Sequence, residues 1–293
     1  MGRISINGFD FQGWSYERIG AFLQSRGIDL FELQYEMGNG QPLADAAPIL
    51  ADYGVAINCI YTGSRWALAH TEQADQALAA LDACIELAGQ VGAPFVQFYP
   101  GVIKGPDSYG DTMLLAERLA RPLERARAAG VTLIFENLFD IKDNDPHGQD
   151  IARGADSTRI LLDLIDSPQL KLNYDPCNFY IAGVEPWPYA YQLLKEHIVY
   201  VHLKDVARYC EWLHGPRAQH RVYREHGREF IIVPLGAGTL NYDGIIAGLR
   251  RDGYAGPLVL EALTVPERQA ESFDQSLAFL RRRLDDSDGR GGA

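Results

Sequence analysis

The sequence lacks the features that mark several large classes of protein. It has four cysteines among 293 residues and no CxxC pair, so neither a disulfide framework nor a zinc ribbon is expected. No uncharged run approaches the length that would cross a bilayer. Lys and Arg number 27 against 39 Asp and Glu, and the resulting net charge of −12 would repel a nucleic-acid backbone. We therefore expect a cytoplasmic protein that binds neither nucleic acid nor membranes.

Motifs for nucleotide binding and for serine hydrolysis are missing as well. No GxGxxG turn follows the first expected strand, and neither a P-loop nor a GxSxG elbow occurs anywhere in the chain. These absences argue against a dinucleotide-binding sheet, a P-loop NTPase and an α/β-hydrolase. No organic cofactor is expected.

What the sequence does contain is a regular alternation of short apolar runs with longer amphipathic stretches, the pattern of βα units. The runs with strand character are Ile4–Phe9, Ile28–Tyr35, Val55–Tyr61, Phe95–Tyr99, Val131–Glu136, Leu170–Asp175, Ile198–Lys204 and Pro257–Ala262. Helices are expected near residues 15–26, 42–52, 71–93, 108–130, 156–166, 187–197, 241–252 and 268–284. Evenly spread units of this number favour a closed (β/α)₈ barrel over an open sheet. The predicted fold is a single α/β TIM barrel over residues 1–285, followed by a flexible tail at 286–293.

One segment interrupts this rhythm. Val206–Phe230 adds roughly twenty residues after the seventh expected strand, where a βα loop normally takes only a few. It carries His214, His220 and His226 among several arginines, at a spacing that fits no standard metal motif. Because long loops on this rim of a barrel commonly serve the active site, we expect an extended lid with one or two substrate contacts. Its local positive charge would attract an acidic or phosphorylated ligand.

Four of the expected strands end in a polar residue that could bind a metal. VTLIFEN ends on Glu136, LKLNYDP on Asp175, IVYVHLKD on His202 and PLVLEAL on Glu261. The C-terminal ends of barrel strands meet on one open face, where a carboxylate buried alone would cost several kcal/mol. Each residue taken singly could be a helix cap or a satisfied core histidine. Together, three carboxylates and one imidazole indicate one site for a divalent cation.

The same segments resemble a known family. The markers are FENLFD after the fifth expected strand, NYDPCNFY after the sixth, VHLKD on the seventh and PLGAGTLNYDGIIAGLRRDGYAGPLVLE leading into the eighth. With these motifs the chain resembles, over residues 3–284, the sugar isomerases and epimerases of the xylose isomerase-like TIM barrels. That group also includes keto-inositol dehydratases and endonuclease IV.

The resemblance implies both a metal site and a pair of catalytic residues. By it, Glu136, Asp175, His202 and Glu261 match the family's single metal site, which is commonly occupied by manganese. Donor chemistry agrees, since an oxygen-rich set with one imidazole suits Mn²⁺ or Mg²⁺ and also accepts Co²⁺, Fe²⁺ or Zn²⁺. The resemblance further implies that Glu136 and Glu261 act as acid and base. A carbonyl polarised by the metal would then lose a neighbouring proton through an enediolate intermediate.

Candidates for binding the substrate surround these ligands, and they are Asn178, Lys204, Arg208, Trp14 and Tyr99. Asn178 stands where many relatives carry a His, and Arg208 is a candidate for the Arg that ketose 3-epimerases use beyond the seventh strand. Lys204 could instead form an ion pair at the rim, for example with Asp205. Trp14 and Tyr99 could pack on a sugar ring or belong to the core.

The function expected first is isomerisation or epimerisation of a keto-sugar or related polyol, with a small carbohydrate as the partner. Asn178 in place of His leaves open a keto-inositol dehydratase or a 3-oxo-glycoside lyase on the same metal site. A metal-dependent endonuclease that cleaves at abasic sites is disfavoured by Asn178 and by the net charge of −12. A non-catalytic sugar-binding barrel is a further alternative. The resemblance also implies a homodimer or a homotetramer.

Overall fold

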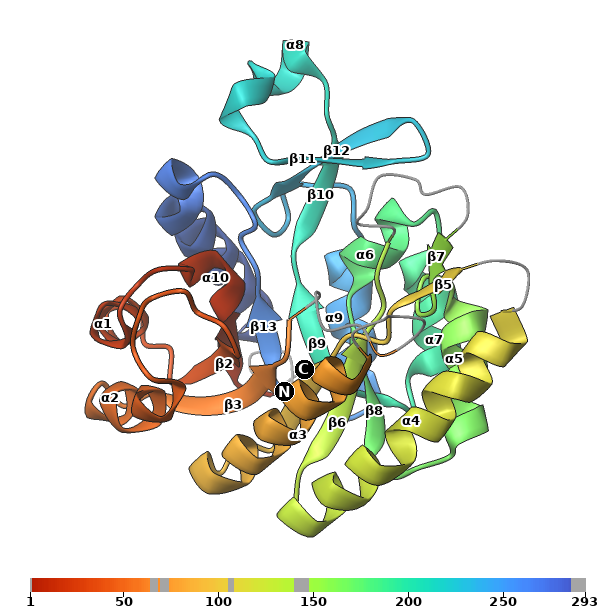
Figure 1. Cartoon of the computed structure of the whole chain (residues 1–293). Helices are drawn as coiled ribbons and strands as arrows, with labels where there is room; N and C mark the ends of the chain where they lie inside the picture. Colours follow the sequence, from red (N-terminus) through yellow and green to blue (C-terminus); the bar gives the residue numbers. More distant parts are fainter. Residues whose placement is uncertain (1, 64–67, 69–73, 105–107, 140–147, 286–293) are drawn as a thin grey trace, which may run out of the picture.

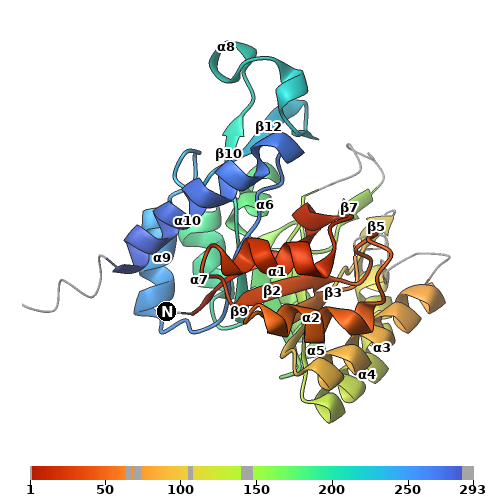
Figure 2. The same cartoon turned by 90° about the vertical axis from the view of Figure 1, so that its left-hand side faces the viewer.

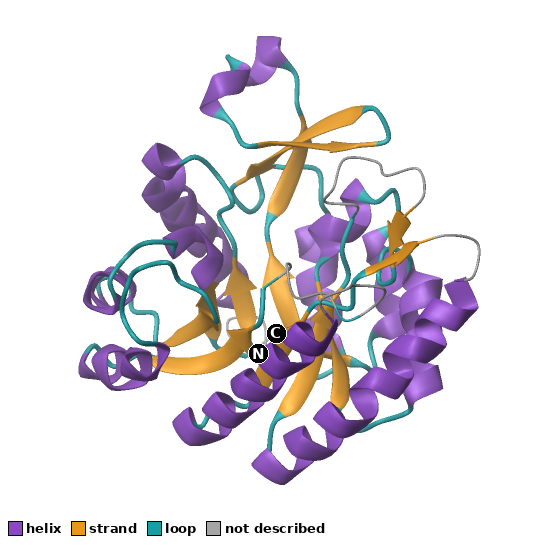
Figure 3. Ribbon diagram, in the orientation of Figure 1, coloured by secondary structure: helices purple, strands orange, loops and turns teal. Residues whose placement is uncertain are grey.

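The chain folds around a closed barrel of parallel strands. The computed structural model describes residues 2–63, 68, 74–104, 108–139 and 148–285. The strands follow one another around the barrel in the order β1-β13-β9-β8-β6-β4-β3-β2, with the helices packed outside them (Figure 1 and Figure 3). Their bounds are β1 Ile4–Asn7, β2 Leu30–Gln34, β3 Ala56–Tyr61, β4 Phe95–Phe98, β6 Thr132–Glu136, β8 Leu170–Tyr174, β9 Ile198–Leu203 and β13 Leu258–Leu260. Each lies within one of the predicted runs, so the predicted TIM barrel is confirmed. The tail at 286–293 lies outside the described residues.

The helices also follow the predicted spacing. The α-helices around the barrel are α1 Tyr16–Gln24, α2 Ala46–Asp52, α3 Ala74–Val91, α4 Ser108–Ala129, α5 Ala155–Ile165, α6 Pro176–Ile181, α7 Tyr191–Leu194, α9 Tyr242–Arg251 and α10 Gln269–Asp285. Shorter 3-10 or π turns are η1 Gly8–Phe11, η2 Leu43–Asp45, η3 Pro186–Ala190, η4 Arg217–Gln219 and η5 Pro266–Arg268. The six-residue helix α6 was not predicted, because its DPCN start was read only as a strand end.

Strand β6 shows how the sequence sorts side chains between the two layers of the core. Leu133 and Phe135 belong to the large cluster between the barrel and the helices. Ile134 belongs instead to a small cluster with side chains of β3, β9 and β13 inside the barrel. Since alternate residues of a strand face opposite sides, Glu136 shares the inward face of Ile134. The parity of the strand therefore turns its last carboxylate into the barrel.

The segment after β9 is a small sheet rather than an irregular loop. Strands β10 Asp205–Arg208, β11 Val222–Glu225 and β12 Arg228–Val233 pair antiparallel in the order β10-β12-β11, and α8 Glu211–His214 lies at the far end. Figure 1 and Figure 2 show this insertion projecting from the barrel beyond the end of β9. The hairpin turn at His226 and Gly227 has positive φ at both residues (47° and 70°), as a tight two-residue turn requires. A second small sheet joins β5 Val102–Lys104 to β7 Gly148–Asp150.

Hydrogen bonds to one buried carboxylate hold the PLGAG segment, residues 234–238, in place. Asp205 accepts hydrogen bonds from the backbone N–H groups of Val206 (2.8 Å), Gly236 (3.0 Å), Gly238 (3.0 Å) and Leu240 (3.2 Å). A Cβ on Gly238 would lie 2.2 Å from Asp205 Oδ1, which no side chain can tolerate. The motif thus fastens the base of the insertion to the chain that leads to α9.

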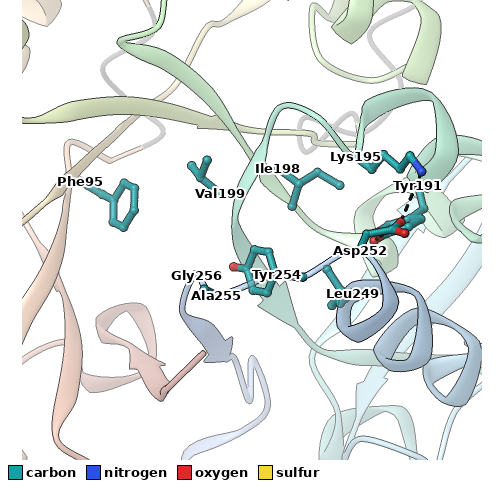
Figure 4. Close-up of a pocket in the computed structure, with 11 residues that line it drawn as sticks. Phe95, Tyr191, Lys195, Ile198, Val199, Leu249, Asp252, Tyr254, Ala255 and Gly256 are labelled. Atoms are coloured by element: carbon teal, nitrogen blue, oxygen red, sulfur yellow. Dashed lines mark hydrogen bonds and ion pairs between the residues drawn. The ribbon is translucent and has the colours of Figure 1, made fainter. Parts of the chain in front are cut away.

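A pocket of about 340 Å³ lies at the N-terminal end of the barrel strands, opposite the insertion. Phe95 and Ile198, which begin β4 and β9, line it together with an ion pair between Lys195 and Asp252 (3.5 Å) (Figure 4). Active sites of TIM barrels lie at the C-terminal ends of the strands, so this pocket is at the wrong end for the predicted chemistry. Within the part of the chain that the structure describes, no helix has the length and apolar character of a membrane span.

Candidate metal centre and active site

The predicted ligands come together at the C-terminal end of the barrel. Glu136 ends β6, His202 lies near the end of β9, and Asp175 and Glu261 directly follow β8 and β13. All four side chains are buried, and one donor atom from each lies within 4.8 Å of the other three donors. Asp175 also caps α6, because its Oδ1 accepts the N–H of Asn178 at 3.0 Å. The strand ends and this cap set the positions of the four groups.

The spacing of these donors suits a single divalent ion. Ligands on opposite sides of an ion that binds oxygen at about 2.1–2.4 Å lie about 4.2–4.8 Å apart. The four donor atoms all lie within 4.8 Å of one another, so one ion could contact all of them. The buried cluster of three carboxylates and one imidazole therefore suggests a divalent metal site, although it does not discriminate among Mn²⁺, Mg²⁺ and Zn²⁺.

The charge of the cluster also calls for a cation. Lys204 Nζ contacts both Asp175 and Glu261 and lies 3.6 Å from Glu136 Oε1. A fourth carboxylate, Glu32 on β2, lies 2.9 Å from His202 Nε2. One ammonium against four buried carboxylates leaves three negative charges unbalanced when the imidazole is neutral, and buried charge of that size is costly unless it is compensated. A divalent ion removes most of the imbalance.

The pKa values of the site record the same imbalance. Burial, together with the negative charges of Glu136 and Glu261, raises the pKa of Asp175 to about 8 although Lys204 opposes the change. Burial alone would lower the pKa of His202, but the surrounding carboxylates outweigh it and raise that pKa well above its ordinary value. Burial acts to raise the pKa of Glu261, but Lys204 and His202 hold it below its usual range. Without a further cation, the site keeps protons that a metal would displace.

Metal affinity should consequently depend on pH. Below pH 8 a divalent ion must displace the proton of Asp175. The dissociation constant of the metal is therefore expected to rise about tenfold for each unit by which the pH falls, for each proton displaced. His202 adds a second proton over part of this range because its pKa is also raised. Calorimetric titration with Mn²⁺ at pH 6, 7, 8 and 9, in two buffers of different ionisation enthalpy, measures both affinity and proton release. An affinity that does not change from pH 6 to 8 would contradict the proposed ligand set.

Glu32 is the site residue that sequence reasoning missed. It is completely buried on β2, beside an irregularity in the pairing of β2 with β3. Its Oε2 accepts hydrogen bonds from His202 Nε2 and from the hydroxyl of Tyr200, each at 2.9 Å, and its Oε1 accepts one from Asn7 at 2.5 Å. With Nε2 thus engaged, His202 Nδ1 points at Glu136 and Glu261, 3.1 Å from an oxygen of each. A charged residue inside the apolar run LFELQ was the signal that could have revealed it, since such a residue needs a buried partner.

Asn178 and Lys204 both lie at the cluster. Asn178 Nδ2 donates to Glu136 Oε1 (2.8 Å) and to the backbone oxygen of Asn137 (3.0 Å), so its amide orients a carboxylate. Lys204 contacts the cluster itself, and the alternative pairing with Asp205 is wrong because that carboxylate is used by backbone N–H groups. Substrate contacts for both residues stay predictions.

The other candidate residues lie farther out. Arg208 ends β10 with its side chain exposed. Trp14 packs edge-on against Phe11 (ring centroids 5.1 Å apart), and the guanidinium of Arg18 covers its ring at 3.5 Å. Tyr99 is buried just beyond β4. Among the described residues, neither Arg208 nor Trp14 forms a hydrogen bond or an ion pair with the four ligands, and the predicted roles of all three in substrate binding are untested.

Comparison with known proteins identifies the family. The model of the xylose isomerase-like TIM barrel family matches residues 21–283, and the chain belongs to that family. A 3-dehydroshikimate dehydratase of Bacillus anthracis is 31% identical over 106 residues, which cover 36% of this chain and 37% of that relative. The chain therefore matches little more than a third of the length of that relative.

Solved structures share the whole fold at low identity. An L-ribulose 3-epimerase superposes with a TM-score of 0.70 and 20% identity over 100% of both chains. A xylose isomerase-like TIM barrel protein from Mycobacterium smegmatis, solved in complex with magnesium, superposes with a TM-score of 0.68 and 20% identity over 97% of this chain and 98% of that one. At such identity the likeness shows the fold alone.

Proposed function

We propose that this protein is a divalent-metal-dependent sugar isomerase or epimerase that removes a proton from the carbon beside the carbonyl of a keto-sugar or related polyol. The observation that carries the proposal is the convergence of Glu136 and Glu261. Their strands, β6 and β13, are separated by β8 and β9 around the barrel, yet an oxygen of each carboxylate lies 3.1 Å from the same nitrogen, His202 Nδ1. Two carboxylates thus approach one point from different sides.

The geometry suggests a catalytic role for each residue. A bound divalent ion would supply Lewis-acid polarisation of the substrate carbonyl. Glu261 and Glu136 would form the acid/base pair, one removing the proton and the other returning it on another face or at the neighbouring carbon. Burial alone would lower the pKa of Lys204, but Asp175, Glu261 and Glu136 raise it well above its ordinary value. The ammonium therefore stays positive and would stabilise negative charge that develops on the substrate oxygen.

Elimination of water is the second candidate on the same site. Both hydrogens of the Asn178 amide are taken, by Glu136 and by the backbone oxygen of Asn137, so Asn178 can donate a hydrogen bond to a sugar, as the His of the epimerases can, only by giving up one of these bonds. The partial likeness to a 3-dehydroshikimate dehydratase supports the same alternative. Loss of a β-hydroxyl after proton removal would use the same carboxylate pair.

Deuterium exchange tests the proposal and separates its two forms. Protein loaded with Mn²⁺, Mg²⁺ or Zn²⁺ is incubated in D₂O with ketoses, keto-inositols and 3-oxo-glycosides, and the products are followed by NMR and mass spectrometry. An isomerase or epimerase places deuterium on the carbon beside the carbonyl and conserves the formula, whereas a dehydratase yields a product that has lost water. Protein treated with a chelator is the control. No exchange and no elimination across the panel, with every metal, would overturn the enolisation mechanism.

A further inference from the structure

The insertion places an arginine over the mouth of the barrel. The guanidinium of Arg221 lies 5.1 Å from the ring centre of Phe9 and 5.4 Å from that of Tyr223, within the range in which aromatic faces attract a cation. Phe9 follows β1 in η1 and is 38% exposed, so this position is open to solutes. The two rings hold the arginine at the rim.

Tyr223 reaches the mouth from the other side. Its ring packs edge-on against Phe139, with centroids 5.7 Å apart and an interplanar angle of 87°. Phe139 follows β6, which lies across the barrel from β1. Residues 221 and 223 share one face of an extended chain, so the pair spans the opening from the β1 side to the β6 side.

Within the described ranges, neither the guanidinium of Arg221 nor the hydroxyl of Tyr223 has an ion-pair or hydrogen-bond partner. Among the described residues, no carboxylate lies within ion-pair distance of Arg221, whereas Arg217 and Arg224 of the same insertion both pair with Glu229, at 3.1 and 3.0 Å. The hydroxyl of Tyr223 is buried and, again within the described part of the chain, makes no hydrogen bond. Buried hydroxyls are nearly always hydrogen-bonded in folded proteins, so this one points to a ligand acceptor.

Arg221 lies on the same side of the barrel opening as the end of β13, and the charges there also act on Tyr223. Burial raises the pKa of the Tyr223 hydroxyl, and the charges of Arg221, Lys204, Asp10 and Glu261 also act on it. The pKa of Asp10 is raised to about 6, chiefly by burial and further by Glu261, while Arg221 opposes the rise. Hydrogen bonds connect the same region: Asp10, which follows Phe9, accepts the backbone N–H groups of Ala262 (2.8 Å) and Leu263 (2.9 Å), directly after Glu261. Arg221, which packs on Phe9, therefore lies at the part of the rim where β13 ends.

We propose that Arg221 and Tyr223 form an anion subsite that selects substrates carrying a carboxylate at the end remote from the reacting carbonyl. The guanidinium would donate two parallel hydrogen bonds to the carboxylate, and the Tyr223 hydroxyl would donate a further one. The inference deepens the proposed function, on which it rests for the position of the reacting group. It narrows the substrate class from neutral keto-sugars to keto-sugar acids.

Equilibrium binding tests the subsite without requiring turnover. Calorimetry on the Mn²⁺-loaded protein compares D-fructuronate with D-fructose, which has a hydroxymethyl group where the acid has its carboxylate. We expect the acid to bind roughly 10- to 100-fold more tightly. Arg221→Met should abolish this preference, and Tyr223→Phe, which removes only the hydroxyl, should reduce it. Arg224→Met, an exposed arginine already paired with Glu229, is the matched control and should keep it.

The outcomes are separable from those of the exchange experiment. Equal affinity for the two sugars, including no binding of either, would overturn the subsite, as would a preference that survives in Arg221→Met. A preference for the acid without any deuterium exchange would leave the subsite standing and refute the proposed reaction. Thermal melting of each variant checks that a lost preference does not come from a lost fold.

Discussion

Replacing Glu261 with Gln is expected to lower proton exchange by about 10²- to 10⁴-fold, the usual contribution of a positioned general base. The amide keeps the shape of the side chain but cannot take a proton. Glu261 contacts Lys204 and lies 3.1 Å from His202 Nδ1, so the change also removes a ligand charge. Rates of deuterium incorporation should therefore be measured at saturating Mn²⁺, with metal content determined by elemental analysis.

The control for this variant is Glu271→Gln on α10, an exposed glutamate whose recorded partner is Gln275. It makes the same chemical change outside the cluster and should leave exchange unaltered. A metal-loaded Glu261→Gln protein that exchanges at the rate of the unmodified chain would remove Glu261 from the acid/base role. Loss of exchange that follows loss of metal would make Glu261 a ligand first and leave Glu136 as the base.

The Glu32→Gln variant is expected to weaken metal binding by about 10- to 100-fold, the usual cost of losing a group that orients a ligand. Glu32 accepts four hydrogen bonds, from His202 and Tyr200 at Oε2 and from Asn7 and Gln34 at Oε1. A glutamine has one acceptor oxygen, so it turns an N–H group toward at least one of these donors. Even with its oxygen toward His202, the neutral amide is a weaker acceptor than the carboxylate, so the contact that holds Nδ1 toward Glu136 is weakened. Unfolding should also become easier by about 1–3 kcal/mol, because a buried polar group is left unpaired.

Asn58→Ala separates the effect on the metal from a general disturbance of the network. Asn58 donates to the hydroxyl of Tyr200 at 2.9 Å and accepts from Ser5 at 2.8 Å, one step farther from the imidazole. Its loss should lower stability by a similar amount and leave Mn²⁺ affinity within about twofold, since it touches no ligand. Equal losses of metal affinity in the two variants would show that Glu32 acts only through packing.

Gln97, inside the barrel, was harder to foresee than the residues at the rim. Asn173 donates to Gln97 Oε1 at 2.7 Å, and Gln97 in turn donates to Glu136 Oε2 at 3.2 Å. These side chains interrupt apolar strands without ending them, so their role depends on which strands face one another. Strand order around the barrel is a long-range property, and the amphipathic pattern of one strand carries no information about its neighbours.

The insertion was anticipated in position and in charge but not in form. Its length and its arginines indicated a lid at the active-site rim, while the turn at His226 and Gly227 makes it a sheet. The sequence therefore predicted the position of the insertion. Which arginine faces the mouth followed from the packing of Arg221 on Phe9, more than two hundred positions away in the sequence.

The sequence by itself determined the barrel and the polar residues at its strand ends, because both are local patterns: apolar runs of strand length, each closed by one group that cannot be buried alone. Only the tertiary structure decided which groups meet. Glu32 and His202 are 170 positions apart, and their contact depends on the closure of eight strands into a ring. Lys204 and the pair of Arg221 with Tyr223 likewise acquire their surroundings from chain that is distant in sequence. The physical reason is that burial and charge pairing act between neighbours in space, and closure of the barrel is what makes these residues neighbours.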